Sequence, residues 1–204
     1  EFSLREIEDD LEAPTEELGA LCLEVAAKVV RDEATLRRLA IPEHAWGLIA
    51  ESWTRGDKSL YGRFDFAYDG ESAAKLLEYN ADTPTSLFES AVVQWQWLRD
   101  LVERKALPAD ADQFNSLHEK LIARWRAVAP IPDQFLHLAC MQSSVEDSGT
   151  IAYLADCATQ AGLETMQIDM GDIGFLMDRF ADREDRHIEC LFKLYPWEWM
   201  FADE

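Results

Sequence analysis

Two short apolar runs, separated by one helix-length segment, dominate the second half of the chain. Residues 134–141 (QFLHLACM) suit a buried strand, residues 150–161 have helical spacing, and residues 165–170 suit another strand after Gly162. Two strands on either side of a helix are typical of a βαβ unit, in which the strands run parallel. The pattern therefore predicts an α/β fold for this half.

The first half of the chain has a different pattern, with amphipathic helices up to about residue 55 and then strand-like alternation. Two alternating segments, on either side of Asp69-Gly70, predict a β-hairpin. The alternation predicts one apolar face, with Phe64, Phe66 and Tyr68 from the first segment and Leu77 and Tyr79 from the second. The other face carries polar side chains, namely those of Arg63, Asp65, Glu78 and Asn80. We therefore expect a helical and β-hairpin region joined to the α/β half.

The charge balance excludes several classes of partner. The 204 residues include 40 acidic and 19 basic side chains, which gives a formal net charge of −21. Nucleic-acid phosphates and anionic membrane surfaces both require Lys and Arg, so neither is an expected partner. No run approaches the ~20 consecutive apolar residues of a membrane span.

The cysteines indicate a reducing environment. Cys22, Cys140, Cys157 and Cys190 are far apart in the sequence, and none has the spacing of a zinc ligand set. The chain begins at Glu1 with acidic sequence and without the basic and apolar regions of a secretory signal. We therefore expect free thiols and a cytoplasmic location.

The polar face of the predicted hairpin is a candidate magnesium site. Asp65 and Glu78 offer carboxylates, Asn80 offers an amide oxygen, and Arg63 offers a guanidinium. Magnesium takes such oxygen ligands and shares phosphate oxygens, while an arginine neutralises the remaining phosphate charge. The alternative is a ladder of surface ion pairs across the hairpin.

Two further segments have both a functional and a structural interpretation. The loop at residues 80–86 precedes a predicted helix, whose amino terminus favours a phosphate or carboxylate, although ordinary capping explains such loops equally well. Glu146 and Asp147 fall in the predicted loop after the first strand of the βαβ unit, where open α/β sheets bind ligands. They suit an amine, or alternatively they stabilise a helix amino terminus.

Three segments together resemble a known family. They are SLYGRFD at residues 59–65, LLEYNADTPT at 76–85 and FKLYPWE at 192–198. They resemble the glutathionylspermidine synthase family, and the resemblance extends over residues 18–201. It is nearest to the branch of stand-alone acid–amine ligases. It implies one pre-ATP-grasp domain over residues 1–204, with a Rossmann-like half and an appended helical and hairpin region.

The resemblance also implies an activity. The family uses ATP and magnesium to convert a substrate carboxylate into an acyl phosphate, which an amine then attacks. Arg63 and Asp65 match positions that contact nucleotide, and Arg63 would be catalytic. The magnesium ligands would be Asp65, Glu78 and Asn80. The substrate contacts would be Thr83 in a pocket for a thiol peptide, and Glu146 and Asp147 for the amine.

Departures from the family pattern limit which substrates are expected. Leu194 stands where bifunctional relatives have Thr, which removes a glutathione contact, and Asp147 replaces a longer Glu. The expected substrates are a carboxylic acid or peptide, with glutathione as one candidate, and an amine, with a polyamine as one candidate. The ATP-grasp portion is expected beyond this chain, so the 204 residues alone should be inactive. The alternative function is a non-catalytic acidic module that binds a basic partner.

Overall fold

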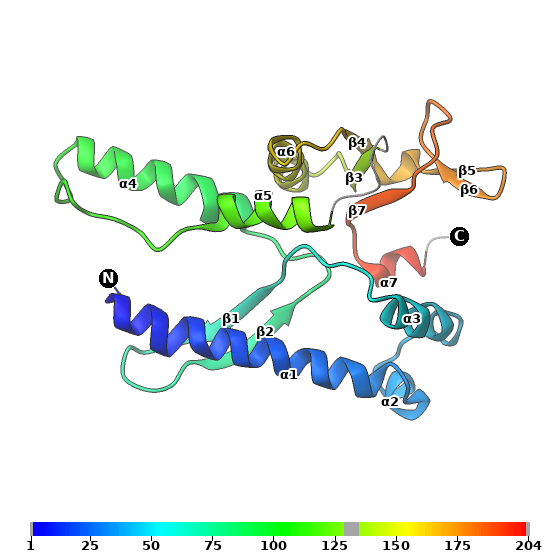
Figure 1. The fold of residues 1–204 in the computed structure, drawn as a ribbon, viewed down its shortest axis with the longest axis horizontal. Coiled ribbons are helices and arrows are strands. Elements are labelled where there is room, and N and C mark those ends of the chain that lie inside the picture. Colours follow the sequence, from blue (N-terminus) through cyan, green and yellow to red (C-terminus); the bar gives the residue numbers. More distant parts are fainter. Residues whose placement is uncertain (1, 129–134, 203–204) are drawn as a thin grey trace. The chain divides into compact units, whose positions relative to one another are not determined.

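The computed structural model describes residues 2–128 and 135–202, which form a mixed α/β structure (Figure 1). The chain divides into two compact units. The smaller unit is Glu1–Ser59 with Phe64–Tyr79, and the larger unit is Leu60–Arg63 with Asn80–Glu204. A single domain over the whole chain stays a prediction. Among the described residues, no helix is both long and apolar enough to cross a membrane.

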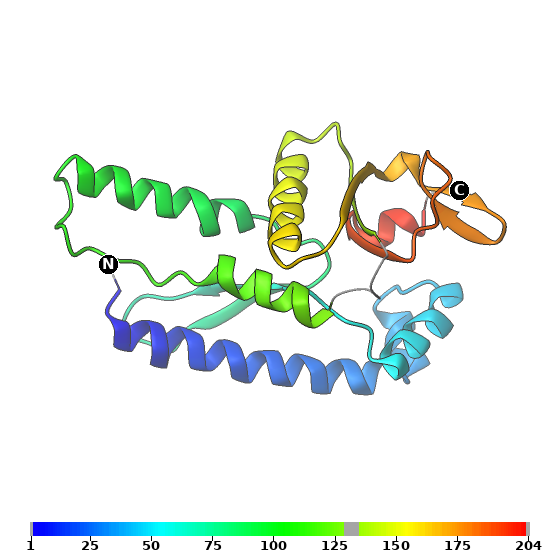
Figure 2. The same cartoon turned by 45° about the horizontal axis from the view of Figure 1, so that its top comes forward.

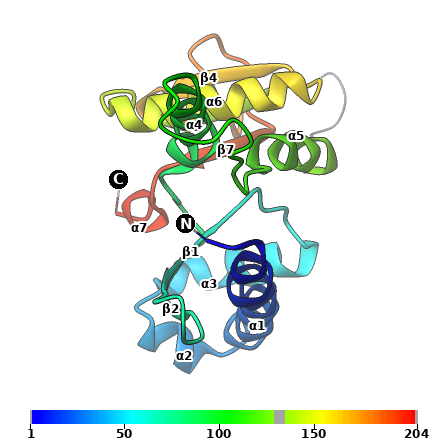
Figure 3. The same cartoon turned by 90° about the vertical axis from the view of Figure 1, so that its left-hand side faces the viewer.

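The smaller unit contains helices and most of a two-stranded sheet (Figure 3). Its elements are η1 (Glu6–Glu12), α1 (Ala13–Val29), α2 (Glu33–Arg38), α3 (Glu43–Arg55), β1 (Arg63–Ala67) and β2 (Lys75–Asn80). Asp32 begins α2, because its carboxylate accepts the N–H groups of Ala34 and Thr35. Gly56 ends α3 with a left-handed φ of 66°.

The hairpin formed by β1 and β2 has the predicted faces. The rings of Phe64 and Tyr79 stack with centroids 4.1 Å apart, and the ring of Phe66 lies 6.0 Å from that of Phe64. Because side chains alternate along a strand, Asp65 and Glu78 lie on the opposite face. The aromatic and polar alternation read from the sequence is therefore confirmed.

The larger unit is built on a three-stranded sheet with the order β4-β3-β7. Its helices are η2 (Glu89–Val93), α4 (Gln94–Glu103), α5 (Leu117–Val128), α6 (Val145–Gln160), η3 (Met170–Asp172) and α7 (Trp197–Met200). Its strands are β3 (Leu136–Cys140), β4 (Thr165–Asp169), β5 (Gly174–Leu176), β6 (Arg179–Ala181) and β7 (Cys190–Leu194). β3 pairs in parallel with both β4 and β7. The predicted βαβ unit is confirmed as β3-α6-β4, while Gln134 lies outside the described residues.

The core of the larger unit lies between its sheet and helices α5 and α6 (Figure 2). The central strand β3 is fully buried, and its Leu136, Leu138 and Cys140 belong to this core. Leu154 and Cys157 of α6 are completely buried against it. Complete burial of one such leucine contributes roughly 2 kcal/mol to folding, so this core is the main stabilising feature of the unit.

Candidate functional site

The loop at residues 80–85, which we term the 80–85 loop, is ordered first by its own asparagine. Asn80 Oδ1 accepts hydrogen bonds from the backbone N–H groups of Asp82 (3.3 Å) and Thr83 (3.1 Å). Asn80 Nδ2 donates to the carbonyl oxygen of Thr83 at 3.3 Å. This arrangement is an Asx turn, which fixes the backbone conformation around Thr83.

Residues at the start of the hairpin hold the other end of the 80–85 loop. Arg63 Nη1 donates to Thr85 Oγ1 at 3.1 Å and to the Thr85 carbonyl oxygen at 3.3 Å. Tyr61 Oη donates to the Pro84 carbonyl oxygen at 2.9 Å. Burial raises the pKa of Tyr61 to about 12, so its hydroxyl stays protonated and remains a donor. The loop is therefore preorganised on both sides of Thr83.

The middle of the 80–85 loop is tied to the end of β7 by a side chain without a predicted role. Asp82 Oδ1 lies 2.6 Å from Lys193 Nζ, and Asp82 Oδ2 accepts the backbone N–H of Trp197 at 2.9 Å. Lys193 Nζ also donates to the Tyr195 carbonyl oxygen at 2.8 Å and lies 4.4 Å from the centre of the Trp197 ring. The loop is thus attached to the segment that follows β7.

Glu146 and Asp147 lie in the first turn of α6, so their placement in a loop was wrong, whereas the alternative of two carboxylates at a helix amino terminus is confirmed. Ser144 is the residue that begins this helix, because its Oγ accepts the N–H of Asp147 at 3.2 Å. The preceding turn is fixed by Asp169 at the end of β4, whose Oδ2 accepts the N–H of Gln142 at 2.8 Å. Both acidic residues therefore follow β3 closely, at a helix amino terminus that favours negative charge.

The parallel register brings two groups of predicted residues to one edge of the sheet. Cys140 pairs with both Asp169 and Leu194, so β3, β4 and β7 end at the same edge. The 80–85 loop, with Asn80 and Thr83, is attached after β7, and Glu146 and Asp147 follow the neighbouring β3. In open α/β sheets, ligands bind at this carboxyl edge.

The four residues of the predicted magnesium site are divided between the two units. Arg63 and Asn80 belong to the larger unit, whereas Asp65 and Glu78 belong to the smaller one. Asp65 is half-buried and Glu78 is exposed. Within residues 2–128 and 135–202, no three His, Cys, Asp or Glu side chains are grouped as metal ligands. The predicted ligand set contains two carboxylates and one amide, and its assembly with Arg63 stays a prediction.

Leu194 lies in the hydrophobic core and not at the surface. Its side chain is 4% exposed and packs with the residues buried against α5 and α6. Lys193, the preceding residue on β7, has a side chain that is 11% exposed and contacts the 80–85 loop. Because neighbouring residues of a strand face opposite sides, Lys193 points away from α5 and α6, and the 80–85 loop contacts it on that side of the sheet.

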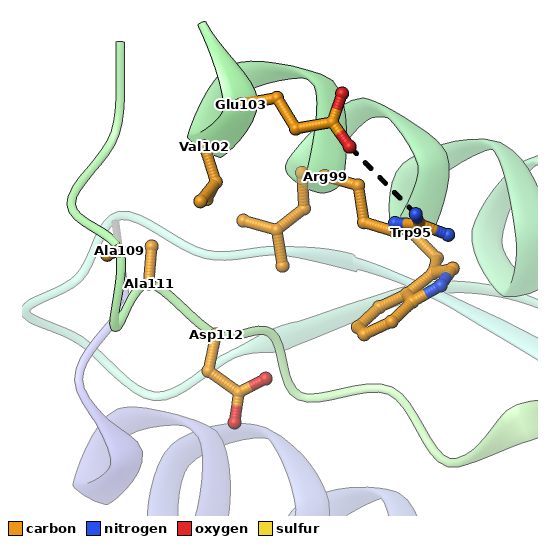
Figure 4. A pocket seen from close by; sticks show the side chains of 8 residues that line it. Trp95, Arg99, Val102, Glu103, Ala109, Ala111 and Asp112 are labelled. Carbon is orange, nitrogen blue, oxygen red and sulfur yellow. Dashed lines mark ion pairs between the residues drawn. The ribbon is translucent and has the colours of Figure 1, made fainter. Parts of the chain in front are cut away.

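A surface pocket of about 290 Å³ lies along α4 and is lined by residues between Trp95 and Asp112 (Figure 4). Its wall combines apolar side chains such as Trp95 and Val102 with the exposed ion pair of Arg99 and Glu103, whose nearest atoms are 3.9 Å apart. None of the predicted site residues lines it.

The sequence of this chain was compared with those of known protein families. The model of the glutathionylspermidine synthase pre-ATP-grasp domain matches residues 1–204. The chain belongs to this family. The family resemblance read from the three sequence segments is therefore confirmed.

The members of this family that the chain matches are longer proteins. An acid–amine ligase by name, from Haemophilus influenzae, is 44% identical over 98% of this chain and 50% of its own length. The bifunctional glutathionylspermidine synthetase/amidase of Escherichia coli is 27% identical over 95% of this chain and 30% of its own. The trypanothione synthetase of Crithidia fasciculata is 26% identical over 89% of this chain and 28% of its own length. The chain therefore spans half or less of the length of these relatives.

Proposed function

We propose that this chain is the substrate- and magnesium-binding part of an ATP-dependent acid–amine ligase. The observation that supports the proposal is the attachment of the 80–85 loop, with Asn80 and Thr83, to the carboxyl end of β7, next to the strand that Glu146 and Asp147 follow. Asn80 is proposed to be a magnesium ligand, and Thr83 is proposed to contact the acid substrate. Glu146 and Asp147, which are anionic, are proposed to hold the amine. The family supports this assignment, because its members named above are ligases or synthetases.

Magnesium is part of this proposal, and the donor chemistry suits it. Asp65 and Glu78 share the polar face of the hairpin and supply the carboxylate oxygens that magnesium prefers. Asn80 Oδ1 already accepts two backbone N–H groups, so its coordination to a metal requires that at least one of these bonds be exchanged. When bound, magnesium would neutralise phosphate charge during phosphoryl transfer.

The proposed roles follow from charge and geometry. Arg63 carries a permanent positive charge beside the 80–85 loop, where it would stabilise a transferring phosphate. Thr83 is held in the Asx turn and would contact the acid substrate. The γ-phosphoryl group of ATP would be transferred to a substrate carboxylate, which releases ADP and forms an acyl phosphate. The amine held by Glu146 and Asp147 would lose a proton and attack the carbonyl carbon, so that the C–N bond forms as the C–O bond to phosphate breaks.

The substrate class is a carboxylic acid or peptide together with an amine. Glutathione and a polyamine are the candidates that the names of the relatives support. The side chain of Leu194 is apolar and buried, so it makes no polar contact with a peptide. An acid other than glutathione is therefore included among the proposed substrates. A cytoplasmic location also belongs to the proposal, and it is supported by four free cysteines.

The test uses a protein of the relatives' length that includes these 204 residues. ADP release is measured with ATP, magnesium and a panel of acid and amine pairs. We expect ADP release that depends on both substrates, and a large loss in Arg63→Met and in the double variant Glu146→Gln/Asp147→Asn. No release with any pair, or equal release from these variants, would contradict the proposal. The 204-residue chain alone should release no ADP.

The net charge of −21 favours a second candidate function, a non-catalytic module that binds a basic partner. The two functions respond differently to mutation. Neutralising several dispersed acidic residues would weaken such a module, whereas it would leave the ligase reaction largely unchanged. The same panel of variants, tested for binding and for ADP release, therefore separates them.

A further inference from the structure

The ammonium group of Lys193 contacts three protein groups. It donates to Asp82 Oδ1 at 2.6 Å and to the Tyr195 carbonyl oxygen at 2.8 Å, and it lies over the Trp197 ring. Its side chain is only 11% exposed. Protein oxygens accept two of its three N–H donors, and its shortest contact is with Asp82, so Asp82 is the group through which Lys193 can act on the site.

Asp82 joins two points of the chain that flank a turn. One carboxylate oxygen binds Lys193 at the end of β7, and the other binds the N–H of Trp197 at the start of α7. These contacts span 111 and 115 residues of sequence. The hydrogen bonds from Tyr61 and Arg63, by contrast, come from the start of the hairpin, which is close to the loop in the sequence. Asp82 therefore supplies the attachment of the 80–85 loop to the sheet.

We propose that Asp82 and Lys193 are positioning residues, which fix the distance between the acid side and the amine side of the site. The proposal rests on the proposed function. The acid side includes Asn80 and Thr83, on either side of Asp82, and the amine side is the start of α6, which follows the strand next to β7. Loss of the pair would let the loop move relative to this edge, and small displacements of reacting groups cost large factors in rate.

The experiment separates positioning from stability by a double-mutant cycle. Lys193→Met leaves Asp82 without its cation, and Asp82→Ala leaves a largely buried ammonium, so each single variant should unfold at a lower temperature. The double variant contains neither charge and should recover much of the lost stability. Its kcat for ADP release, measured in the protein of the relatives' length, should still be about tenfold or more below wild type. Lys120→Met, at an exposed position on α5, is the matched control and should change neither quantity.

A second measurement tests directly whether Asp82 attaches the 80–85 loop to Trp197. Hydrogen exchange of the Trp197 amide is measured in the 204-residue chain, and it should be at least about tenfold faster in Asp82→Ala than in the Lys120→Met control. Recovery of both stability and kcat in the double variant would overturn the proposal, because the pair would then be only structural. Unchanged exchange at Trp197 would also overturn it. If the wild-type ligase releases no ADP, the proposed function fails, and the exchange result alone decides whether Asp82 holds the loop.

Discussion

His137 Nε2, in the central strand, lies 3.3 Å from Asp182 Oδ2, and both side chains are almost completely buried. Asp182 also accepts hydrogen bonds from Arg186 Nε (2.7 Å) and from the backbone N–H groups of Glu184 and Arg186 (both 3.0 Å). Burial by itself raises the pKa of Asp182, but these hydrogen bonds outweigh it and lower the pKa from 3.8 to about 2. The charged carboxylate therefore stabilises the folded chain.

The first prediction concerns acid stability. Because the pKa of Asp182 is lower in the folded state, its contribution is complete above the unfolded value and is lost as the pH falls from about 4 to about 2. Asp182→Ala should lower the free energy of unfolding at neutral pH by roughly 3 kcal/mol. Urea unfolding at several pH values should show a weaker pH dependence in this variant between pH 4 and 2. Asp110→Asn, at an exposed position, should behave like wild type.

The second prediction concerns two helix ends in the smaller unit. Ala40 follows α2 with φ 58°, and Gly56 follows α3 with φ 66°. A left-handed backbone is unfavourable for alanine and costs glycine little, so Ala40→Gly should stabilise the unit by about 1 kcal/mol. Gly56→Ala should destabilise it by a similar amount, although its added methyl group meets no neighbouring atom within 4 Å. Thermal unfolding that shifts in the same direction for both variants would contradict this.

The third prediction compares the two faces of the hairpin. Phe64→Ala removes the ring that stacks on Tyr79 and should cost roughly 2 kcal/mol, because the ring is half-buried. Arg63→Met keeps much of the side-chain length but loses the hydrogen bonds to Thr85, and it should lower stability by about 1–2 kcal/mol while the protein still folds. It should, however, lower ligase turnover by about 100-fold. If Arg63→Met unfolds the protein and Phe64→Ala lowers only turnover, the roles of the two faces are reversed.

The fourth prediction tests the magnesium ligands. Asp65→Glu keeps the charge but moves the carboxylate by one methylene, and magnesium tolerates little deviation from octahedral geometry at ~2.1 Å. We expect the magnesium concentration for half-maximal ADP release to rise at least about tenfold. Glu71→Asp, an equally small change at an exposed position in the turn of the same hairpin, should leave it unchanged. A wild-type magnesium requirement in Asp65→Glu would remove Asp65 from the proposed ligands.

Local patterns in the sequence predict the parts of this structure that depend on neighbouring residues. The alternation around Phe64 and Tyr79 gives the hairpin faces, and the two apolar runs give β3 and β4. The start of α6 was also present in the sequence, because Ser144 and Asp147 have the spacing of a helix cap. The loop interpretation of that segment was therefore wrong, and the alternative interpretation of Glu146 and Asp147 as helix-terminal carboxylates was correct.

Contacts over long sequence distances could not be predicted in this way. Residues 188–200 begin like a strand, but no local pattern shows that β7 pairs in parallel with β3. The link between Asp82 and Lys193 depends on that pairing, and neither residue differs in its immediate sequence from an ordinary surface charge. The hairpin β5-β6 was missed because its strands contain only three residues each.

The position of β7 late in the chain has a consequence for biosynthesis. The chain emerges from the ribosome in order, and contacts that close long loops form late. Asp82 is made 111 residues before Lys193, so the loop around it can form its Asx turn and its bonds to Tyr61 and Arg63 early, but cannot be anchored until Trp197 has emerged. Nascent chains that stop before β7 should therefore contain the candidate loop without its final anchor.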